Sequence, residues 1–176
     1  MSMDDAPTPA GTSAAVPSDG PAGSAPTVAA YLAVADEAFD GIEAVLALLD
    51  DDSVNRTPLP GTVNTVFALM THVHGMACYW GGSLIAGERN PRDRASEFRS
   101  RGTVAEARDL LDDLRTRLPG WVDIACTEGV RDPHAAGTSR SDAADVTAEW
   151  ALQHLFHEIA QHSGHMEICR DLVLAD

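Results

Sequence analysis

Apolar residues recur every three to four positions along most of this 176-residue chain, and that repeat commits the chain to amphipathic α-helices. No stretch combines strand-like alternation with the turn residues of a β-hairpin. We therefore predict an all-α fold, a four-helix bundle with long crossover loops. The four helices are expected over residues 28–49, 62–85, 103–126 and from Asp145 or Thr147 to about Leu172.

Local signals at the helix ends sharpen this prediction. Thr103 is a good N-cap residue, and Glu106 three positions later completes a capping box for the third helix. Pro119, followed by a glycine, lies inside the same helix and predicts a kink or a stop there. The polar segments 86–102 and 127–143 then connect the helices, the second as a long loop.

Residues 1–26 differ in composition from the rest of the chain. They hold five of the ten prolines, scattered among Gly, Ser, Thr and Ala. Such a segment buries too little apolar surface to offset the entropy that it would lose on ordering. It also lacks the basic start and continuous apolar core of a signal peptide. We therefore predict a flexible tail over residues 1–26 and one bundle domain over residues 27–176.

The acidic composition limits the partners that this chain can have. Its 12 Lys and Arg residues stand against 27 Asp and Glu, a formal net charge of −15. This balance argues against binding to nucleic acids or anionic membranes, which needs clustered cations. No apolar run approaches the roughly 20 residues of a membrane span. Three cysteines without a CxxC pair favour a reducing compartment, so we predict a cytoplasmic protein.

Histidines are concentrated where a bundle core would gain nothing from them. Four of the seven lie in the last predicted helix. Because each helical residue advances by about 100°, several of these side chains share one face with an acid and a thiol. Imidazoles and a carboxylate on one face are potential metal ligands. This face carries His154, Glu158, His162, His165 and Cys169.

Spacing alone leaves three choices for a metal site on this face. The stripe spans roughly 16 Å, too far for one ion with bonds of about 2 Å, so only side chains on neighbouring turns can share an ion. A carboxylate and a histidine four residues apart are also often a simple ion pair without any metal. The competing pairs are His154 with Glu158, Glu158 with His162, and His162 with His165.

A third ligand would have to come from another helix, and His72 is the candidate. It shares a face with Leu69 and Met76, which are expected to point towards the core. His74 is turned from His72 by roughly 200°, so the two rings cannot reach one ion.

The last helix resembles a known family. Residues 150–172 are similar to the last-helix signature of the DinB-like metalloprotein superfamily, in particular its actinobacterial branch related to the mycothiol-dependent maleylpyruvate isomerases. In the second helix, Leu69, His72 and Trp80 fit the same family, and the resemblance covers about residues 28–174. Gln161 stands where the family usually has Arg. The matching residues of the last helix are Trp150, Leu152, His154, Glu158, Ala160, His162, Gly164, His165, Glu167 and Arg170.

The resemblance implies a specific ligand set. The family places one ligand on the second helix and two on the last helix, which correspond here to His72, Glu158 and His162. The implied ion is divalent, with zinc as the first choice and nickel as the second. One departure stands out, because Ala77 occupies a position where this branch usually carries Glu.

The resemblance also implies a function. A low-molecular-weight thiol, mycothiol, would bind to zinc as a thiolate and attack a small electrophilic substrate, which describes an S-transferase or an isomerase. His165 or His154 would then serve as a proton shuttle. Apart from the resemblance, Arg170 is expected either to anchor an anionic substrate group or to complement the helix dipole near the C-terminus, and Trp80 is expected in the walls of the core and the pocket. Relatives are often dimers, and we expect residues 86–102 at the interface of such a homodimer.

Two other functions use the same residues. A metal-bound hydroxide would make the protein a hydrolase of a small ester or amide, and a bundle that binds metal without turnover would be no enzyme at all. The cysteines are assigned to packing. Cys78 and Cys126 are expected in or near the core without a neighbouring base, and Cys169 is expected to pack one turn beyond His165.

Overall fold

A computed structural model of the chain describes residues 28–59, 61, 64–138 and 143–175. The predicted tail over residues 1–26 lies outside these ranges. Within them, every regular element is helical, which confirms the all-α prediction. The long helices are α1 (Val28–Leu46), α2 (Val66–Ala77), α4 (Val104–Thr127) and α5 (Ala148–Ala175). The short elements are α3 (Arg94–Glu97), a π-helical segment (Cys78–Ile85) that continues α2, and two 3₁₀ turns (Ser53–Asn55 and Ala143–Asp145).

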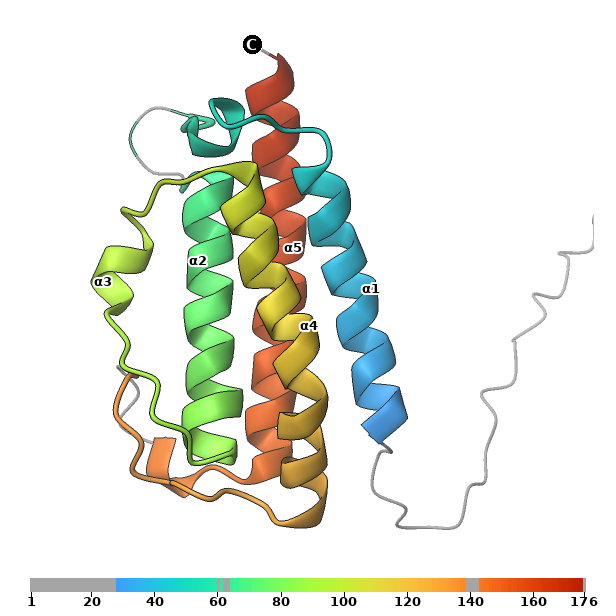
Figure 1. Cartoon of the computed structure of the whole chain (residues 1–176), viewed down its shortest axis with the longest axis vertical. Helices are drawn as coiled ribbons and strands as arrows, with labels where there is room; N and C mark the ends of the chain where they lie inside the picture. Colours follow the sequence, from blue (N-terminus) through green and yellow to red (C-terminus); the bar gives the residue numbers. More distant parts are fainter. Residues whose placement is uncertain (1–27, 60, 62–63, 139–142, 176) are drawn as a thin grey trace, which may run out of the picture.

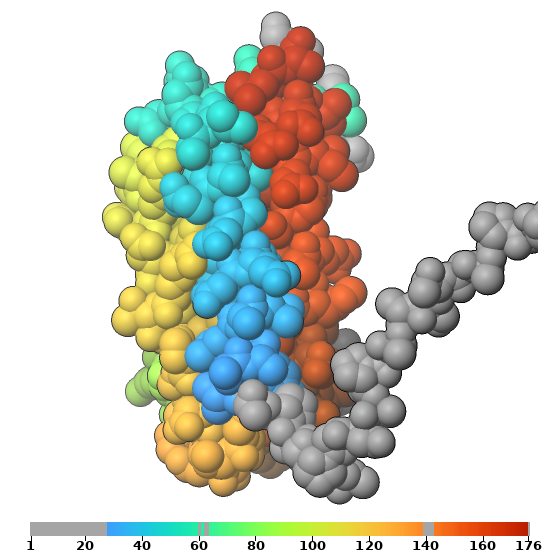
Figure 2. Space-filling model, turned by 90° about the vertical axis from the view of Figure 1, so that its right-hand side faces the viewer, coloured from blue at the N-terminus to red at the C-terminus, as the bar shows by residue number. Residues whose placement is uncertain are grey.

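The four long helices form a bundle in which two consecutive long helices, α2 and α4, run in the same direction. In Figure 1, α1 and α5 run upwards, whereas α2 and α4 both run downwards. The chain must therefore return along the full length of α2 before α4 begins, and α3 lies on that return. Both α1 and α2 pack against α4 and α5. Figure 2 shows α1 in blue to cyan, lying between α4 in yellow and α5 in red. None of the described helices is long and apolar enough to cross a membrane.

Hydrogen bonds at the start of α4 follow the predicted signal, whereas α2 begins at a cap that was not predicted. The Thr103 hydroxyl accepts from the backbone N–H of Glu106 at 3.1 Å, and the Glu106 carboxylate accepts from the backbone N–H of Thr103 at 2.7 Å. This confirms the capping box. At α2, Thr65 caps the helix by accepting from Ala68 N–H at 3.1 Å, so the helix begins four residues later than predicted.

Pro119 does not end α4, so of the two predicted outcomes the stop is wrong. The helix continues for eight more residues to Thr127. Leu118, Trp121 and Val122 are each at most 2% exposed. Burial of these side chains on both sides of the proline keeps the helical path despite the lost backbone hydrogen bond.

The π-helical segment gives Trp121 its place in the core. A Cβ on Gly81 would overlap Cε3 of Trp121 and lie 2.7 Å from its Cδ2, so only glycine lets the indole lie flat against the backbone. Trp121 is 2% exposed, and its Nε1–H donates to Glu88 Oε1 at 3.0 Å. The contact ties α4 to the end of α2.

Substitution of two helical glycines by alanine is expected to have opposite effects. Gly81→Ala should lower the free energy of unfolding by about 1–3 kcal/mol, because the added methyl overpacks against Trp121. Gly120→Ala in α4 meets no atom within 4 Å and should raise it by about 0.5–1 kcal/mol. Urea denaturation of both variants measures the two effects, and effects of the same sign would contradict this packing.

Candidate metal centre

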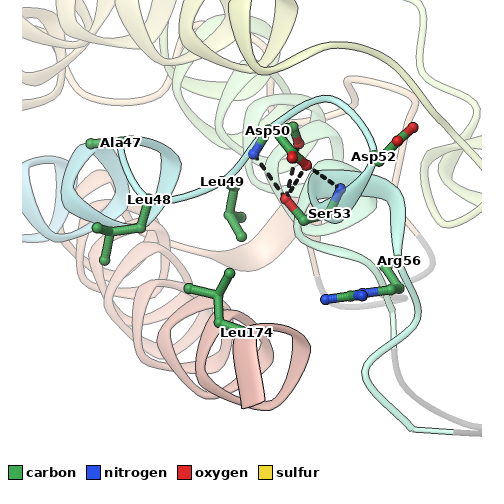
Figure 3. A pocket seen from close by; sticks show the side chains of 8 residues that line it. All are labelled: Ala47, Leu48, Leu49, Asp50, Asp52, Ser53, Arg56 and Leu174. Atoms are coloured by element: carbon green, nitrogen blue, oxygen red, sulfur yellow. Dashed lines mark hydrogen bonds between the residues drawn. The ribbon is translucent and has the colours of Figure 1, made fainter. Parts of the chain in front are cut away.

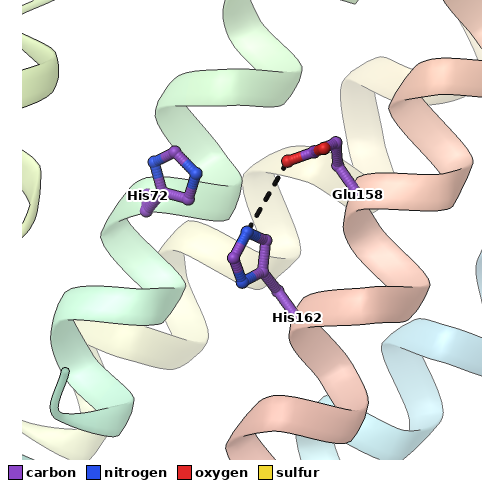
Figure 4. A group of neighbouring side chains, drawn as sticks. All are labelled: His72, Glu158 and His162. Atoms are coloured by element: carbon purple, nitrogen blue, oxygen red, sulfur yellow. Dashed lines mark ion pairs between the residues drawn. The ribbon is translucent and has the colours of Figure 1, made fainter. Parts of the chain in front are cut away.

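Three potential metal ligands meet between α2 and α5. His72 comes from α2, and Glu158 and His162 come from α5. One ligand atom of each side chain lies within 4.8 Å of those of the other two (Figure 4). Of the three pairs that spacing along the last helix left open, the structure brings Glu158 and His162 to His72.

The two α5 side chains lie one helical turn apart at the edge of the core. The Nε2 atom of His162 is 3.6 Å from Oε2 of Glu158. The His72 and His162 rings meet edge to face, with centroids 4.9 Å apart. His72 is buried, and the other two side chains are partly buried. The site is therefore shielded on the α2 side and partly open on the α5 side.

A carboxylate outside the predicted set holds His72 from behind. The Nδ1 atom of His72 lies 2.7 Å from Oε2 of Glu97, the last residue of α3. Arg92 donates to both oxygens of Glu97, at 2.6 and 3.0 Å. Burial alone would raise the pKa of Glu97, but the hydrogen bonds from His72 and Arg92 lower it. Glu97 is therefore ionised, and His72 turns its other ring nitrogen towards Glu158 and His162 (Figure 4).

The residues present fit a divalent metal ion. Burial is the main cause that lowers the pKa of His162, which favours the neutral imidazole that a metal ligand must be. Nδ1 of His162 is buried without a hydrogen-bond partner among the described residues, so the protein itself satisfies only part of this ring. Two imidazole nitrogens and one carboxylate are donors that zinc, nickel and related ions accept.

His165 lies next to this ligand group, and Arg170 lies farther away. The His165 and His162 rings are nearly parallel, with centroids 6.2 Å apart. Arg170 is eight residues beyond His162, a rise of about 12 Å along the helix. Its guanidinium pairs with Asp171 at 2.6 Å. The predicted roles of both residues stay predictions.

His154 belongs to an aromatic group about two turns of α5 before His162. Its ring stacks on Trp150, with centroids 4.9 Å apart, and meets the edge of Trp80 at 4.9 Å. Trp80 is buried, whereas Trp150 is 38% exposed. The three rings thus contact one another, and the role of Trp80 as a wall of the pocket stays a prediction.

Sequence reasoning missed Glu97 and Arg92. Both lie in residues 86–102, which we expected at a dimer interface, but Glu97 is 5% exposed and faces α2 within the same chain. No spacing rule links Glu97 to His72, because 25 residues separate them. Ala77, where the resembling branch carries Glu, is fully buried.

The comparison with known families agrees with this geometry. Residues 30–174 match the family described as Mycothiol-S-transferase. The chain belongs to the mycothiol S-transferase family. No curated protein and no solved structure matches the chain. The match confirms the resemblance to mycothiol-related DinB-like proteins and includes all three potential ligands.

This mycothiol S-transferase family protein has a second polar cluster on the opposite side of α2. His74, Cys78 and Asp113 offer ligand atoms within 4.8 Å of one another. However, Arg117 Nη1 lies 3.1 Å from both the Cys78 sulfur and Asp113 Oδ2. A guanidinium thus already supplies the positive charge, and the cluster is a resident ion-pair network.

The cysteine assignments are only partly correct. Cys78 is buried as predicted, but His74 Nε2 lies 3.7 Å from its sulfur, so the expectation of no neighbouring base is wrong. Burial is the main cause that raises the pKa of Cys78 to about 11, which keeps the thiol protonated at neutral pH. Cys126 is exposed, because α4 turns that position away from the bundle. Cys169 is buried and donates to the Asn64 carbonyl at 3.7 Å.

A surface pocket of about 480 Å³ lies at the far end of α5 (Figure 3). Asp50 and Ser53 in its wall bond to each other, with 2.5 Å between Ser53 Oγ and Asp50 Oδ1. Leu174, also in the wall, is 12 residues beyond His162. None of the predicted site residues lines this pocket, so it is separate from the candidate metal centre.

Arg117→Gln should weaken the pH dependence of stability. Burial opposes ionisation of Glu88 and Asp113. Hydrogen bonds, including those from Arg117, outweigh this effect and lower the pKa of each below its ordinary value, 4.5 for Glu and 3.8 for Asp. Their stabilisation is therefore present at pH 7 and is lost as the pH falls through this range. The variant should lose about 1 kcal/mol at pH 7 and less at pH 3.

Urea denaturation at the two pH values measures this effect. Arg108→Gln is the matched control, because its pair with Glu43 at 3.0 Å is exposed and should contribute less. An identical loss at both pH values in Arg117→Gln would contradict the assignment.

Proposed function

We propose that this protein is a metal-dependent mycothiol S-transferase. His72, Glu158 and His162 hold the ion, with zinc as the first choice and nickel as the second. The observation that carries the proposal is the approach of two imidazoles and a carboxylate within 4.8 Å, in a chain of the Mycothiol-S-transferase family. Three protein ligands leave at least one coordination position open, as catalytic rather than structural sites do.

The chemistry that such an ion supplies is deprotonation of a coordinated thiol. The mycothiol sulfur would then form a bond to an electrophilic carbon of a small substrate. In the same step either a leaving group would depart with its bonding electrons, or the π electrons of a double bond at that carbon would move to the neighbouring atom. The thiol proton would pass through a base to the group that receives those electrons. The product is an S-conjugate. If the C–S bond later breaks and the thiol regains its proton, the net reaction is an isomerisation.

His165 is the base that the geometry favours. Its ring lies parallel to that of His162 at 6.2 Å, one turn along the same face of α5. His154 has stacking partners in Trp150 and Trp80, which suits a wall that positions a ligand rather than a group that moves a proton. Arg170, near the end of the helix, is proposed to bind an anionic group of the substrate.

A hydrolase is the competing enzyme. The same open position could hold water, whose pKa a zinc ion lowers towards 7. The two reactions differ in which ligand the loaded protein binds, so a thiol-binding experiment separates them. A bundle that binds metal without thiol binding or turnover would be the third outcome.

Protein purified without a His tag should contain about one equivalent of divalent metal. His162→Ala should lose it, because the remaining pair of donors holds an ion weakly. His157→Ala is the matched control, since His157 lies on the same helix with an exposed side chain and should keep the metal. Elemental analysis by mass spectrometry measures the content. A wild type that is metal-free and cannot be reloaded would sink the proposal.

Mycothiol should stabilise the metal-loaded protein. At a hundredfold excess over Kd, a ligand adds about 2.7 kcal/mol, which raises Tm by about 5–10 °C for a chain of this size. The cobalt-substituted protein should also gain a sulfur-to-cobalt absorption band when mycothiol is added.

The controls for this experiment are S-methyl mycothiol and the His162→Ala variant, both of which should give no band. Ester or amide turnover without a thiol effect would favour the hydrolase. No turnover and no thiol effect would favour the non-catalytic bundle.

A further inference from the structure

The segment that returns along α2, residues 86–103, is called the return segment here. It packs very closely against α2 beside the candidate metal centre. A Cβ on Gly75 would overlap Oε1 of Glu97 and lie 2.9 Å from its Cδ. Gly75 is one turn beyond His72 on the same helix. Its missing side chain therefore makes room for the carboxylate beside the imidazole.

The hydrogen-bond pattern around Glu97 fixes where the His72 hydrogen lies. Arg92 donates to Oε1 through Nε and to Oε2 through Nη2. Its remaining nitrogen, Nη1, donates to the carbonyl of Gly137 at 3.2 Å. Because an ionised carboxylate only accepts hydrogen bonds, the 2.7 Å contact with His72 needs a hydrogen on Nδ1.

Packing restrains the His72 ring in this orientation. The ring of Phe98, the residue after Glu97, lies against the imidazole with centroids 4.6 Å apart. His72 is 4% exposed and Glu97 is 5% exposed, so water does not compete well for their hydrogen bond.

We propose that Glu97 is a positioning residue of the metal centre, which holds His72 in the tautomer with hydrogen on Nδ1 and leaves Nε2 for the ion. Arg92 and Gly75 support it, the first by orienting the carboxylate and the second by admitting it. The proposal rests on the proposed function for the metal, whereas the tautomer itself can be tested without metal. Carboxylates behind ligating histidines also raise the basicity of the ligand nitrogen.

Loss of the Glu97 carboxylate should weaken zinc binding. Glu97→Ala should raise the zinc Kd by about 10–100-fold, measured by competition with a chromophoric chelator. Glu97→Gln should fall between wild type and alanine, because its amide oxygen still accepts from Nδ1 without the negative charge. Gly75→Ala should weaken binding although it removes no polar group, because its methyl would displace the Glu97 carboxylate. Glu128→Gln is the matched control, since Glu128 is an exposed acid paired with Arg131, and it should bind zinc like wild type.

The tautomer is read from long-range ¹H–¹⁵N spectra of the metal-free protein, with His72→Gln to assign the signals. Wild type should show the hydrogen on Nδ1, and Glu97→Ala should shift His72 towards the Nε2–H form. A wild type with hydrogen on Nε2, or a zinc Kd in folded Glu97→Ala within twofold of wild type, would overturn the proposal.

The two proposals can fail separately. If wild type binds no zinc but carries hydrogen on Nδ1, the proposed function fails and the contact between Glu97 and His72 stands. If zinc binds and the tautomer is the other one, only the positioning role fails. Circular dichroism melts of each variant show whether it is folded, and Glu97→Gln remains an informative variant if Glu97→Ala does not fold.

Discussion

Burial of one face of α5 is the constraint on which the rest of the structure depends. Leu155, Ile159 and Met166 are each at most 1% exposed, and they fix the rotation of the helix against α1 and α2. Once that rotation is set, the helical repeat places Glu158 and His162 at the border of the buried face, next to α2. Apolar packing thus positions the polar side chains of the site, because it contributes far more to the free energy of folding than their own polar contacts do.

The topology of the bundle then supplies what a buried histidine needs. Because α2 and α4 run in the same direction, the chain must pass back along α2, and that passage carries Arg92, Glu97 and Phe98 to His72. Burial of an imidazole destabilises the folded protein when either ring nitrogen lacks a polar partner. The return segment satisfies one nitrogen and leaves the other for a ligand, so a connection required by topology becomes part of the site.

The sequence predicts those features that depend on neighbours along the chain. Helical periodicity is enough for the four long helices, and the capping box at Thr103 follows from two residues three positions apart. The approach of Glu97 to His72 depends on the path of a loop, and the need for glycine at position 75 appears only when the carboxylate is in place. The helix also continues past Pro119, because burial of the side chains around it outweighs the local cost of a proline inside a helix. The choice among three ligand pairs needed the family resemblance as well as the spacing.

The charges around the two polar clusters of α2 support the proposal of a metal ion at only one of them. Both offer imidazole and carboxylate groups, and the second even adds a thiol. There, Arg117 already neutralises Asp113, and an incoming ion would have to overcome the repulsion of a guanidinium 3.1 Å from two of its ligand atoms. In the first cluster the corresponding cation, Arg92, is engaged by both oxygens of Glu97 behind His72. Among the described residues, no arginine therefore neutralises Glu158 in the way that Arg117 neutralises Asp113, which supports the proposed ion at this cluster. A thiol bound to that ion would lose its proton, whereas burial keeps the thiol of Cys78 protonated at neutral pH.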